Sequence, residues 1–379
     1  MRTIYLDYNA TTPVAPSVQE AMLPFLTEHY GNPSSHHWLG RACQEAVEDS
    51  RAHLASLLRC EPEEMIFTSC GTESNNLAIK GIMLQGFPGE VGHLIISALE
   101  HPAVVAPARF LERLGFDVTV VPCDQNGVVD PSEIEAAIRA ETRLVSVMHA
   151  NNEIGTIQPI RQIAEICHAH DVLIHTDAAQ SVGKMWVVPD ELEVDLLTVV
   201  GHKMYAPKGI GALYVRRGIA LEPVIHGAGH EEGVRSGTEN VASIVGLGQA
   251  ANLAIKGIDE MFDRMTILRD RLMNTLRDTI GDGLIVFGEE ASRLPNTLGV
   301  AFSGVLGGAM LERIPEICAS TGAACHSGSA AVSDTLQAIG IKPEVAAGSV
   351  RLSIGWYTSE EDIDRAASLL IAAWEDLHT

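Results

Sequence analysis

The first 245 residues alternate between short apolar runs rich in β-branched side chains and segments with helical periodicity. The runs predict strands at 65–68, 93–97, 118–121, 144–149, 172–176, 196–200 and 212–215. Helical patterns lie between them at 74–84, 103–114, 131–140 and 160–170. Strands that are apolar nearly throughout and separated by helices indicate an α/β fold in which helices cover both faces of a mostly parallel, seven-stranded sheet.

The pattern changes after this predicted sheet. A long helix is expected at about 244–279, followed by extended segments at 284–287, 297–302 and 350–354 and a final helix at 359–377. Ser359 can cap the last helix, and Asp362 stands where a capping box usually places Glu or Gln. We therefore expect a large domain at 15–245 and a smaller α+β domain built from 1–14 and 246–379.

The charge balance excludes some functions. Lys and Arg number 26 against 49 Asp and Glu, giving a net charge of −23, so nucleic-acid binding is not expected. No run approaches the roughly 20 apolar residues of a membrane helix, and the first residues resemble neither a secretory signal nor a transit peptide. The seven cysteines form no Cys-x-x-Cys pair, so neither a zinc nor a redox motif is expected. Together these features predict a cytoplasmic protein with reduced thiols.

Ligands of parallel sheets bind beyond the carboxyl ends of the strands, so the residues that follow each run are informative. After 65–68 comes Gly71-Thr72 at the start of a predicted helix, where free backbone N–H groups and the helix dipole suit a phosphate. The same polar residues could serve only as a helix cap. No P-loop or G-x-G-x-x-G motif is present, which argues against an ATPase or a Rossmann dinucleotide site.

Two further strand ends suit pyridoxal phosphate. Asp177 follows the run 172–176, and Lys203 follows the run 196–200. A lysine can form a Schiff base with the cofactor aldehyde, and an acid can keep the pyridine nitrogen protonated. Lys208 lies five residues away, and spacing alone does not exclude it as the Schiff-base lysine.

Other polar residues fall at the same predicted edge. His101 could stack on a flat ring or move a proton near neutral pH, although it could equally be bonded to backbone groups. Asn152 follows the run 144–149, and Gln180 stands three residues after Asp177. In the second domain, Cys325 lies in a small, polar, glycine-containing segment, so we expect an exposed and mobile thiol. Arg351 could clamp a substrate carboxylate or pair with an acid of the chain.

Taken together, these residues resemble the cysteine desulfurase family of fold-type I pyridoxal-phosphate enzymes, which belong to the class-V aminotransferase group. The resemblance spans essentially the whole chain. Its motifs are YLDYNATTP at 5–13, GNPSS at 31–35, TESNNLA at 72–78, EH at 100–101, NNEIG at 151–155, DAAQSVG at 177–183, GHK at 201–203, RSGTEN at 235–240, STGAAC at 320–325 and RLSIG at 351–355.

The resemblance implies roles around the cofactor pyridoxal 5'-phosphate. Lys203 rather than Lys208 would be the Schiff-base lysine, and Asp177 would pair with the ring nitrogen. The remaining implied cofactor contacts are Gln180 at the ring hydroxyl, His101 stacked on the ring, Asn152 beside it, and Gly71, Thr72 and His202 at the phosphate. Thr238 would reach the phosphate of a neighbouring subunit, which implies a homodimer.

The resemblance also implies the reaction. Arg351 and Asn152 would bind the substrate carboxylate, and His101 would exchange protons. Cys325 would take the sulfur of L-cysteine as a persulfide, leaving L-alanine. A sulfur-acceptor protein for iron–sulfur cluster or thio-cofactor assembly would then receive the sulfur.

Three positions depart from the family pattern, and one of them is Ala206, where a glycine is more usual. Val200 stands where the family usually has a serine on the cofactor phosphate, so one hydrogen bond would be missing. His326 follows Cys325, where Thr or Ser is commoner, and this string also resembles selenocysteine lyases. A lyase that releases selenium from L-selenocysteine is therefore the alternative function.

Overall fold

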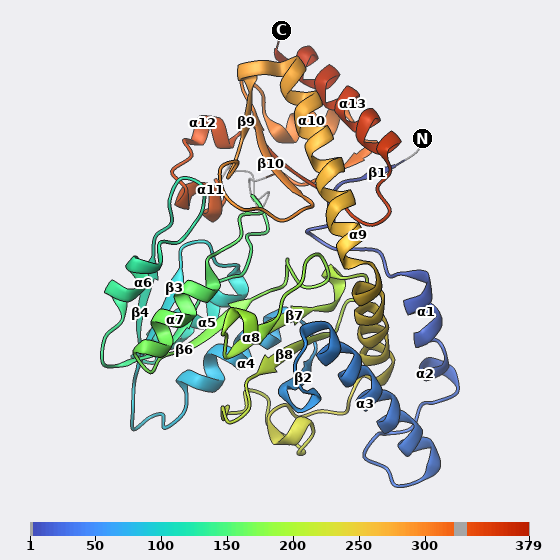
Figure 1. Cartoon of the computed structure of the whole chain (residues 1–379), viewed down its shortest axis with the longest axis vertical. Coiled ribbons are helices and arrows are strands. Elements are labelled where there is room, and N and C mark those ends of the chain that lie inside the picture. Colours follow the sequence, from blue (N-terminus) through green and yellow to red (C-terminus); the bar gives the residue numbers. More distant parts are fainter. Residues whose placement is uncertain (1–2, 322–331, 379) are drawn as a thin grey trace.

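The computed structural model describes residues 3–321 and 332–378, so Cys325 lies outside the described residues (Figure 1). Its main feature is a sheet of seven strands that confirms the predicted fold class. Their order is β2 (Met65–Thr68), β8 (Gly211–Val215), β7 (Leu196–Val200), β6 (Leu173–Asp177), β5 (Thr142–Ser146), β3 (His93–Ser97) and β4 (Asp117–Val121). Only β8 runs antiparallel to its neighbours. The other pairs are parallel.

The strand predictions agree closely with these bounds. The runs 65–68, 93–97 and 196–200 match β2, β3 and β7 residue for residue. The largest difference is at β5, which was expected at 144–149 and ends at Ser146. Beyond that point the chain still bonds to β6, through the Val147 N–H to the His175 carbonyl at 3.1 Å and the His149 N–H to the Asp177 carbonyl at 2.9 Å. It no longer pairs with β3, because β3 ends at Ser97.

Helices cover both faces of the sheet. On one face α3 (Trp38–Leu58), α6 (Pro131–Ala137), α7 (Ile160–Ala169) and the first half of α9 (Val241–Ile280) pack against the strands. On the other face lie α4 (Gly71–Met83) and α5 (Pro102–Arg113). The two-residue period of β7 explains this division, since Leu196 joins one hydrophobic cluster while Leu197 and Val199 join the other.

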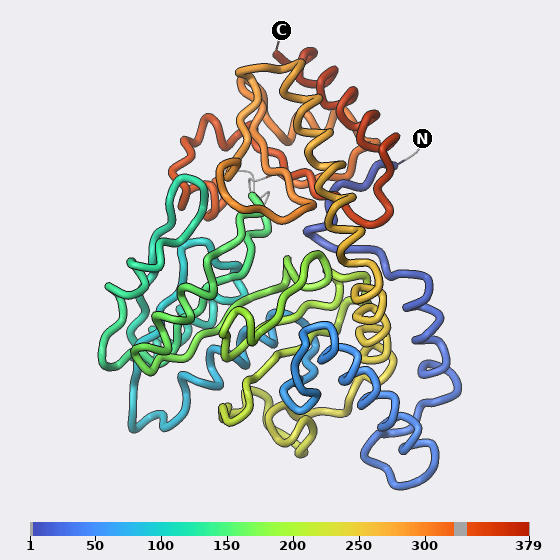
Figure 2. The backbone as a smooth tube through the Cα atoms, viewed as in Figure 1, coloured from blue at the N-terminus to red at the C-terminus, as the bar shows by residue number. Residues whose placement is uncertain are grey.

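A second body lies above the sheet in Figure 1. It holds the antiparallel sheet β12–β10–β9 and the parallel pair of β1 with β11. These strands are β12 (Ser349–Ser353), β10 (Thr297–Phe302), β9 (Leu284–Val286), β1 (Ile4–Tyr5) and β11 (Ile317–Cys318). The second half of α9, α10 (Gly307–Arg313) and α13 (Glu360–His378) supply its hydrophobic cluster. Figure 2 shows the blue N-terminal segment running among the orange and red C-terminal segments.

The remaining helices are short. They are α1 (Pro16–Met22), α2 (Pro24–Thr27), α8 (Pro189–Leu192), α11 (Asp334–Ala338), α12 (Pro343–Ala346) and 3₁₀ turns at Pro62–Glu64, Gly201–Lys203, Glu231–Gly233 and Gly281–Gly283. The predicted cap of α13 is confirmed, because the Asp362 N–H donates to Ser359 Oγ at 3.1 Å and the Ser359 N–H donates to Asp362 Oδ2 at 3.0 Å.

The helix α9 joins the two bodies as one continuous helix of 40 residues. It begins at Val241 because the Asn240 side chain accepts a hydrogen bond from the Ser243 N–H. Among the described residues it is the one helix long and apolar enough to cross a membrane, but 56% of its apolar window is buried. Its small and apolar residues pack on the sheet, as in the core helix of a globular domain. The predicted boundary at residues 245 and 246 falls inside α9, and the division into two domains remains a prediction.

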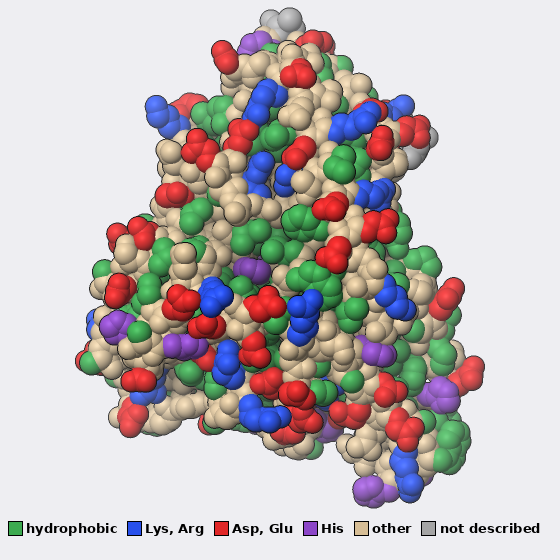
Figure 3. Space-filling view, viewed as in Figure 1, with side chains coloured by type: hydrophobic (Ala, Val, Ile, Leu, Met, Phe, Trp, Pro, Cys, Tyr) green, Lys and Arg blue, Asp and Glu red, His purple; other side chains and the backbone are tan. Residues whose placement is uncertain are grey.

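The surface reflects the acidic composition. Figure 3 shows Asp and Glu side chains spread over the visible face, with fewer Lys and Arg side chains among them. Many of these charges form exposed ion pairs, such as Arg313 with Asp376 at 2.6 Å. The face shown carries no continuous basic surface.

Candidate active site

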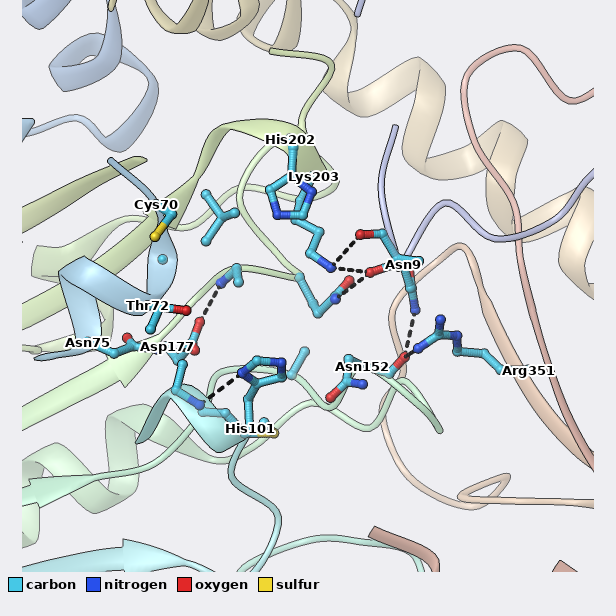
Figure 4. A pocket seen from close by; sticks show the side chains of 18 residues that line it. Asn9, Cys70, Thr72, Asn75, His101, Asn152, Asp177, His202, Lys203 and Arg351 are labelled. Carbon is cyan, nitrogen blue, oxygen red and sulfur yellow. Dashed lines mark hydrogen bonds between the residues drawn. The ribbon is translucent and has the colours of Figure 1, made fainter. Parts of the chain in front are cut away.

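A cavity of about 400 Å³ lies at the carboxyl ends of β6 and β7 and is closed by residues from both ends of the chain (Figure 4). Nine of the sequence-predicted site residues line it, namely Gly71, Thr72, His101, Asn152, Asp177, Gln180, His202, Lys203 and Arg351. Thr238 does not line it, and Cys325 lies outside the described residues. The wall also contains Asn9, Cys70, Asn75 and Val200.

Lys203 ends the 3₁₀ turn that follows β7, and its side chain points toward Asn9 (Figure 4). Its Nζ donates to the Ala10 carbonyl at 3.0 Å and to the Asn9 carbonyl. Burial and the nearby Arg351 lower the pKa of Lys203 to about 8, although Asp177 and Asp7 act in the opposite direction. A substantial fraction of this amine is therefore neutral near pH 8. Lys208, in contrast, is exposed and lines no part of the cavity.

Asp177 is the last residue of β6 and is 7% exposed. Its Oδ2 accepts a hydrogen bond from Asn75 Nδ2 at 2.6 Å, and its Oδ1 accepts one from the Ala179 N–H at 2.9 Å. These two donors fix the carboxylate at the cavity wall. Asn75 was missed from the sequence, although it stands three residues after Thr72 and so shares its helix face.

His101 caps the first turn of α5, where its Nδ1 accepts a hydrogen bond from the Ala103 N–H at 3.1 Å. In the neutral ring the proton is therefore on Nε2. Burial lowers the pKa of His101, and the charge of Lys203 lowers it further against the opposing effect of Asp177. Although the ring is exposed to the cavity, the surrounding protein keeps it mostly neutral.

The start of α4 forms the end of the cavity suited to an anion. Gly71 and Thr72 open this helix, so their N–H groups are among those without partners inside it. A Cβ at Gly71 would overlap Cγ2 of Val200, so the close approach of helix and strand requires glycine here. His202 lies nearby, and burial together with Lys203 and Lys208 lowers its pKa to about 4. Nδ1 of this neutral ring lies 3.3 Å from Thr11 Oγ1.

Arg351 reaches the cavity from β12. Its Nη2 donates to Asp7 Oδ1 at 2.8 Å and to Ser320 Oγ at 3.1 Å. Its Nη1 donates to the Asn152 carbonyl at 3.2 Å, so Asn152 contacts it through the backbone. Among the described residues, the buried Nε of Arg351 has no hydrogen-bond partner. The guanidinium is thus held in place while one N–H group remains unused.

Asn9 is the residue that the sequence analysis missed most clearly. Its carbonyl accepts from Lys203 and from Gln180 Nε2, the latter at 3.0 Å. Its side chain donates to Thr297 Oγ1 at 2.8 Å and accepts from Asn296 Nδ2 at 3.0 Å. These contacts join the N-terminal segment to the edge of the sheet and to β10. No local pattern signals this role, because the partners are distant in sequence.

Thr238 lies in a separate cavity of about 180 Å³ beside β2, with Ser69 and Glu239 in the same wall. Thr238 therefore does not contact the anion-binding end of the cavity in its own chain. A contact with the neighbouring subunit remains a prediction.

Comparison with known proteins agrees with this site. The family model of class-V aminotransferases matches residues 4–366. The chain is 45% identical over 380 residues to the cysteine desulfurase IscS of Dictyoglomus turgidum, covering 100% of this chain and 96% of that protein. A solved NifS-like protein superposes with a TM-score of 0.91 at 36% identity, covering 99% of both chains. A structure of SspA in complex with cysteine superposes with a TM-score of 0.80 at 35% identity, covering 94% of this chain and 100% of that chain.

The chain therefore belongs to the class-V aminotransferases, which are fold-type I enzymes dependent on pyridoxal 5'-phosphate. Within that class it belongs to the cysteine desulfurase family.

The residues present fit this cofactor. Lys203 supplies an amine of lowered pKa, and Asp177 supplies a fixed carboxylate in the same cavity. The start of α4 supplies the anion-binding end, where Gly71 leaves room that a Cβ would fill. The donors and acceptors thus match an aldehyde, a ring nitrogen and a phosphate.

Proposed function

We propose that the protein is a cysteine desulfurase that converts L-cysteine to L-alanine. The sulfur passes to Cys325 as a persulfide and then to an acceptor protein for iron–sulfur cluster or thio-cofactor assembly. The observation that carries the proposal is that one cavity holds both the Lys203 amine and the Arg351 guanidinium. The first suits the cofactor aldehyde and the second suits an amino-acid carboxylate. The names of the relatives support the same reaction.

When bound, the cofactor supplies an electron-withdrawing ring that stabilises negative charge at the substrate Cα. Lys203 would hold the cofactor and, once the substrate amine has displaced it, would take the proton from Cα, for which a pKa of about 8 is well placed. Asp177 would keep the ring nitrogen protonated, and Gln180 would donate to the ring hydroxyl. Gly71, Thr72 and His202 would hold the phosphate.

Arg351 and Asn152 would orient the substrate carboxylate, and His101 would stack on the cofactor ring and move protons through Nε2. The thiolate of Cys325 attacks the substrate sulfur, so the Cβ–S bond breaks and an S–S bond forms. The electrons of the broken bond stay with carbon, where a proton is added at Cβ. Lys203 returns the proton to Cα, and the products are alanine and the persulfide. Neither an external oxidant nor a reductant is needed.

We further infer that the enzyme acts as a homodimer in the cytoplasm. Thr238 lies away from the cavity of its own chain, so its contact with a phosphate would be made in the neighbouring subunit. The cysteines within the described residues are free, which agrees with a reducing compartment. The large domain at 15–245 would hold the cofactor, and the small domain would carry Cys325.

The test measures alanine release from L-cysteine and, separately, from L-selenocysteine. Wild type is compared with Cys325→Ala and with Cys318→Ala, which removes another free thiol exposed in β11. We expect the first variant to lose cysteine turnover while it retains the yellow cofactor, and the second to remain active. Full cysteine turnover by Cys325→Ala, or activity on selenocysteine alone, would contradict the proposal and favour a selenocysteine lyase.

A further inference from the structure

Lys184 is buried behind the cavity and has no role in the mechanism above. It is 5% exposed, which is rare for a lysine, and it does not line the cavity. Its Nζ donates to Asn9 Oδ1 and to Gln180 Oε1, both at 2.9 Å. Within the described part of the chain, no carboxylate forms an ion pair with it. Both partners are side-chain amides at the cavity wall.

The contact with Lys184 fixes which end of the Gln180 carboxamide faces the cavity. Because Oε1 accepts from Lys184, the amide nitrogen is on the other side, where it donates to the Asn9 carbonyl at 3.0 Å. Rotating the amide by 180° would place a donor against Lys184 and an acceptor against the Asn9 carbonyl, so both hydrogen bonds would be lost. One N–H of Gln180 remains for a ligand, since an amide nitrogen carries two hydrogens.

The second contact of Lys184 holds Asn9 in place. Asn9 Oδ1 accepts from Lys184 and from Asn296, while the Asn9 carbonyl accepts from Lys203. Lys184 and Lys203 thus bind the same residue, one through its side chain and one through its backbone. The position of Asn9 therefore sets both the orientation of Gln180 and the resting place of the reactive amine.

The role does not require a charge on Lys184. Burial, together with the charges of Lys203 and Arg351, lowers the pKa of Lys184 well below its ordinary value. An ammonium carries three hydrogens and a neutral amine carries two, so either form can donate to both oxygens. A neutral amine adds no further positive charge beside Lys203.

We propose that Lys184 is a positioning residue that keeps the Gln180 amide nitrogen facing the cavity, so that the site offers a donor to the ring oxygen of pyridoxal phosphate. This inference rests on the proposed contact of Gln180 with that oxygen. The inference predicts that Lys184 affects cofactor binding through Gln180, although Lys184 itself contacts only protein groups.

The experiment titrates apo-enzyme with pyridoxal 5'-phosphate and follows the visible band and its pH dependence. We expect Lys184→Met to bind the cofactor about tenfold more weakly, the loss expected for one hydrogen bond in a buried site, and to shift the midpoint of the pH titration. The matched control is Lys80→Met, since Lys80 is partly buried over the Phe110 ring at 4.5 Å, away from the cavity. This control should bind as wild type does.

A double-mutant cycle separates positioning from general damage to the fold. If Lys184 acts through Gln180, then Lys184→Met should cause little further loss of affinity in a Gln180→Leu background. Full additivity of the two losses, or unchanged affinity and pH midpoint in Lys184→Met, would overturn the inference.

Gln180→Glu provides a second test that does not depend on Lys184→Met folding. The carboxylate can still accept from Lys184, but it has no N–H for the cavity. The variant also loses the hydrogen bond to the Asn9 carbonyl, so its apo-protein should still fold but with a lower melting temperature. We expect weakened cofactor binding by the folded protein, and unchanged binding would contradict the inference. Cofactor binding is measured in the absence of cysteine. A wild type that binds the cofactor but forms no alanine from cysteine would therefore contradict the proposed function and not the inference about Lys184.

Discussion

Arg351 Nη2 donates to the carboxylate of Asp7 at 2.8 Å, although Arg351 also lines the cavity where a substrate carboxylate is proposed to bind. Asp7 Oδ1 also accepts from Ser320 Oγ at 2.9 Å. The guanidinium is therefore already paired with an acid of the chain before substrate arrives. A substrate must either share this guanidinium with Asp7 or use the N–H of Nε, which has no partner among the described residues.

Replacing Asp7 by Asn should strengthen substrate binding. The variant removes a negative charge that competes for Arg351, so we expect the KM for L-cysteine to fall by about threefold to tenfold, as for the loss of a partly exposed ion pair. Steady-state kinetics over a range of cysteine concentrations measures this change. Ser320→Ala is the control, because it removes a hydrogen bond from Asp7 without changing a charge. A rise in KM would show that Asp7 positions Arg351 more than it competes.

Replacing Arg351 by Lys should weaken substrate binding and leave the cofactor in place. Lysine keeps the charge but loses the planar pair of donors, so we expect KM to rise by about tenfold to a hundredfold. The visible spectrum should be unchanged, since the cofactor contacts come from other elements. Arg313→Lys, at an exposed ion pair on α10, should leave KM unchanged. Loss of the visible band in Arg351→Lys would contradict the separation of the two roles.

The lowered pKa of Lys203 predicts a pH-dependent stability of the apo-protein. Its pKa falls from the ordinary 10.5 to about 8, so between these values the unfolded chain binds more protons than the folded one. Stability therefore rises with pH across this window, and below it the buried cation is destabilising. Lys203→Met should make apo-protein more stable at pH 7 by up to about 3 kcal/mol, with the difference disappearing near pH 10.5.

Chemical denaturation of apo-protein at several pH values measures this difference. Lys342→Met is the control, because Lys342 is exposed and its loss should have little effect at any pH. A constant difference between Lys203→Met and wild type from pH 7 to 10.5 would mean that packing, and not the charge, is responsible.

Gly71→Ala should destabilise the protein and weaken cofactor binding. The new Cβ would overlap Cγ2 of Val200, and overpacking of this kind costs about 1–3 kcal/mol. The double variant Gly71→Ala, Val200→Ala makes room for the methyl group, so we expect it to recover most of the lost stability. Thermal unfolding of apo-protein and cofactor titration follow both effects. A double variant that is less stable than Gly71→Ala alone would show that this contact is not the cause.

The sequence was sufficient to predict the central sheet, because buried strands and amphipathic helices each have a local hydrophobic pattern. The seven strands and the helices between them differ from the predicted bounds by a few residues at most. The short parallel pair of β1 and β11 was not predicted, since strands of two residues carry no periodicity. Their pairing depends on segments more than 300 residues apart, which no local pattern records.

The site could be predicted where residues follow strands and not where they are placed by distant contacts. Asp177 and Lys203 stand at strand ends, so topology alone brings them to one edge. Asn9 and Lys184 look like ordinary loop residues in the sequence. The amine of Lys184 donates to Asn9 and Gln180, and the position of Asn9 depends in turn on Ser353 Oγ, which accepts from the Asn9 N–H at 3.0 Å.

The contacts of the N-terminal segment also govern when the cavity can form during synthesis. Ile4 pairs with Ile317, and Asn9 bonds to Ser353, so residues 4–9 must wait for partners that are synthesised more than 300 residues later. At about 5–20 residues per second, the interval between them is on the order of 15 to 60 s. The central sheet can fold on the ribosome within that time, but the nascent chain holds an unfinished pocket. Capture of the cofactor in its final site therefore follows the synthesis of the segment that holds Ser353.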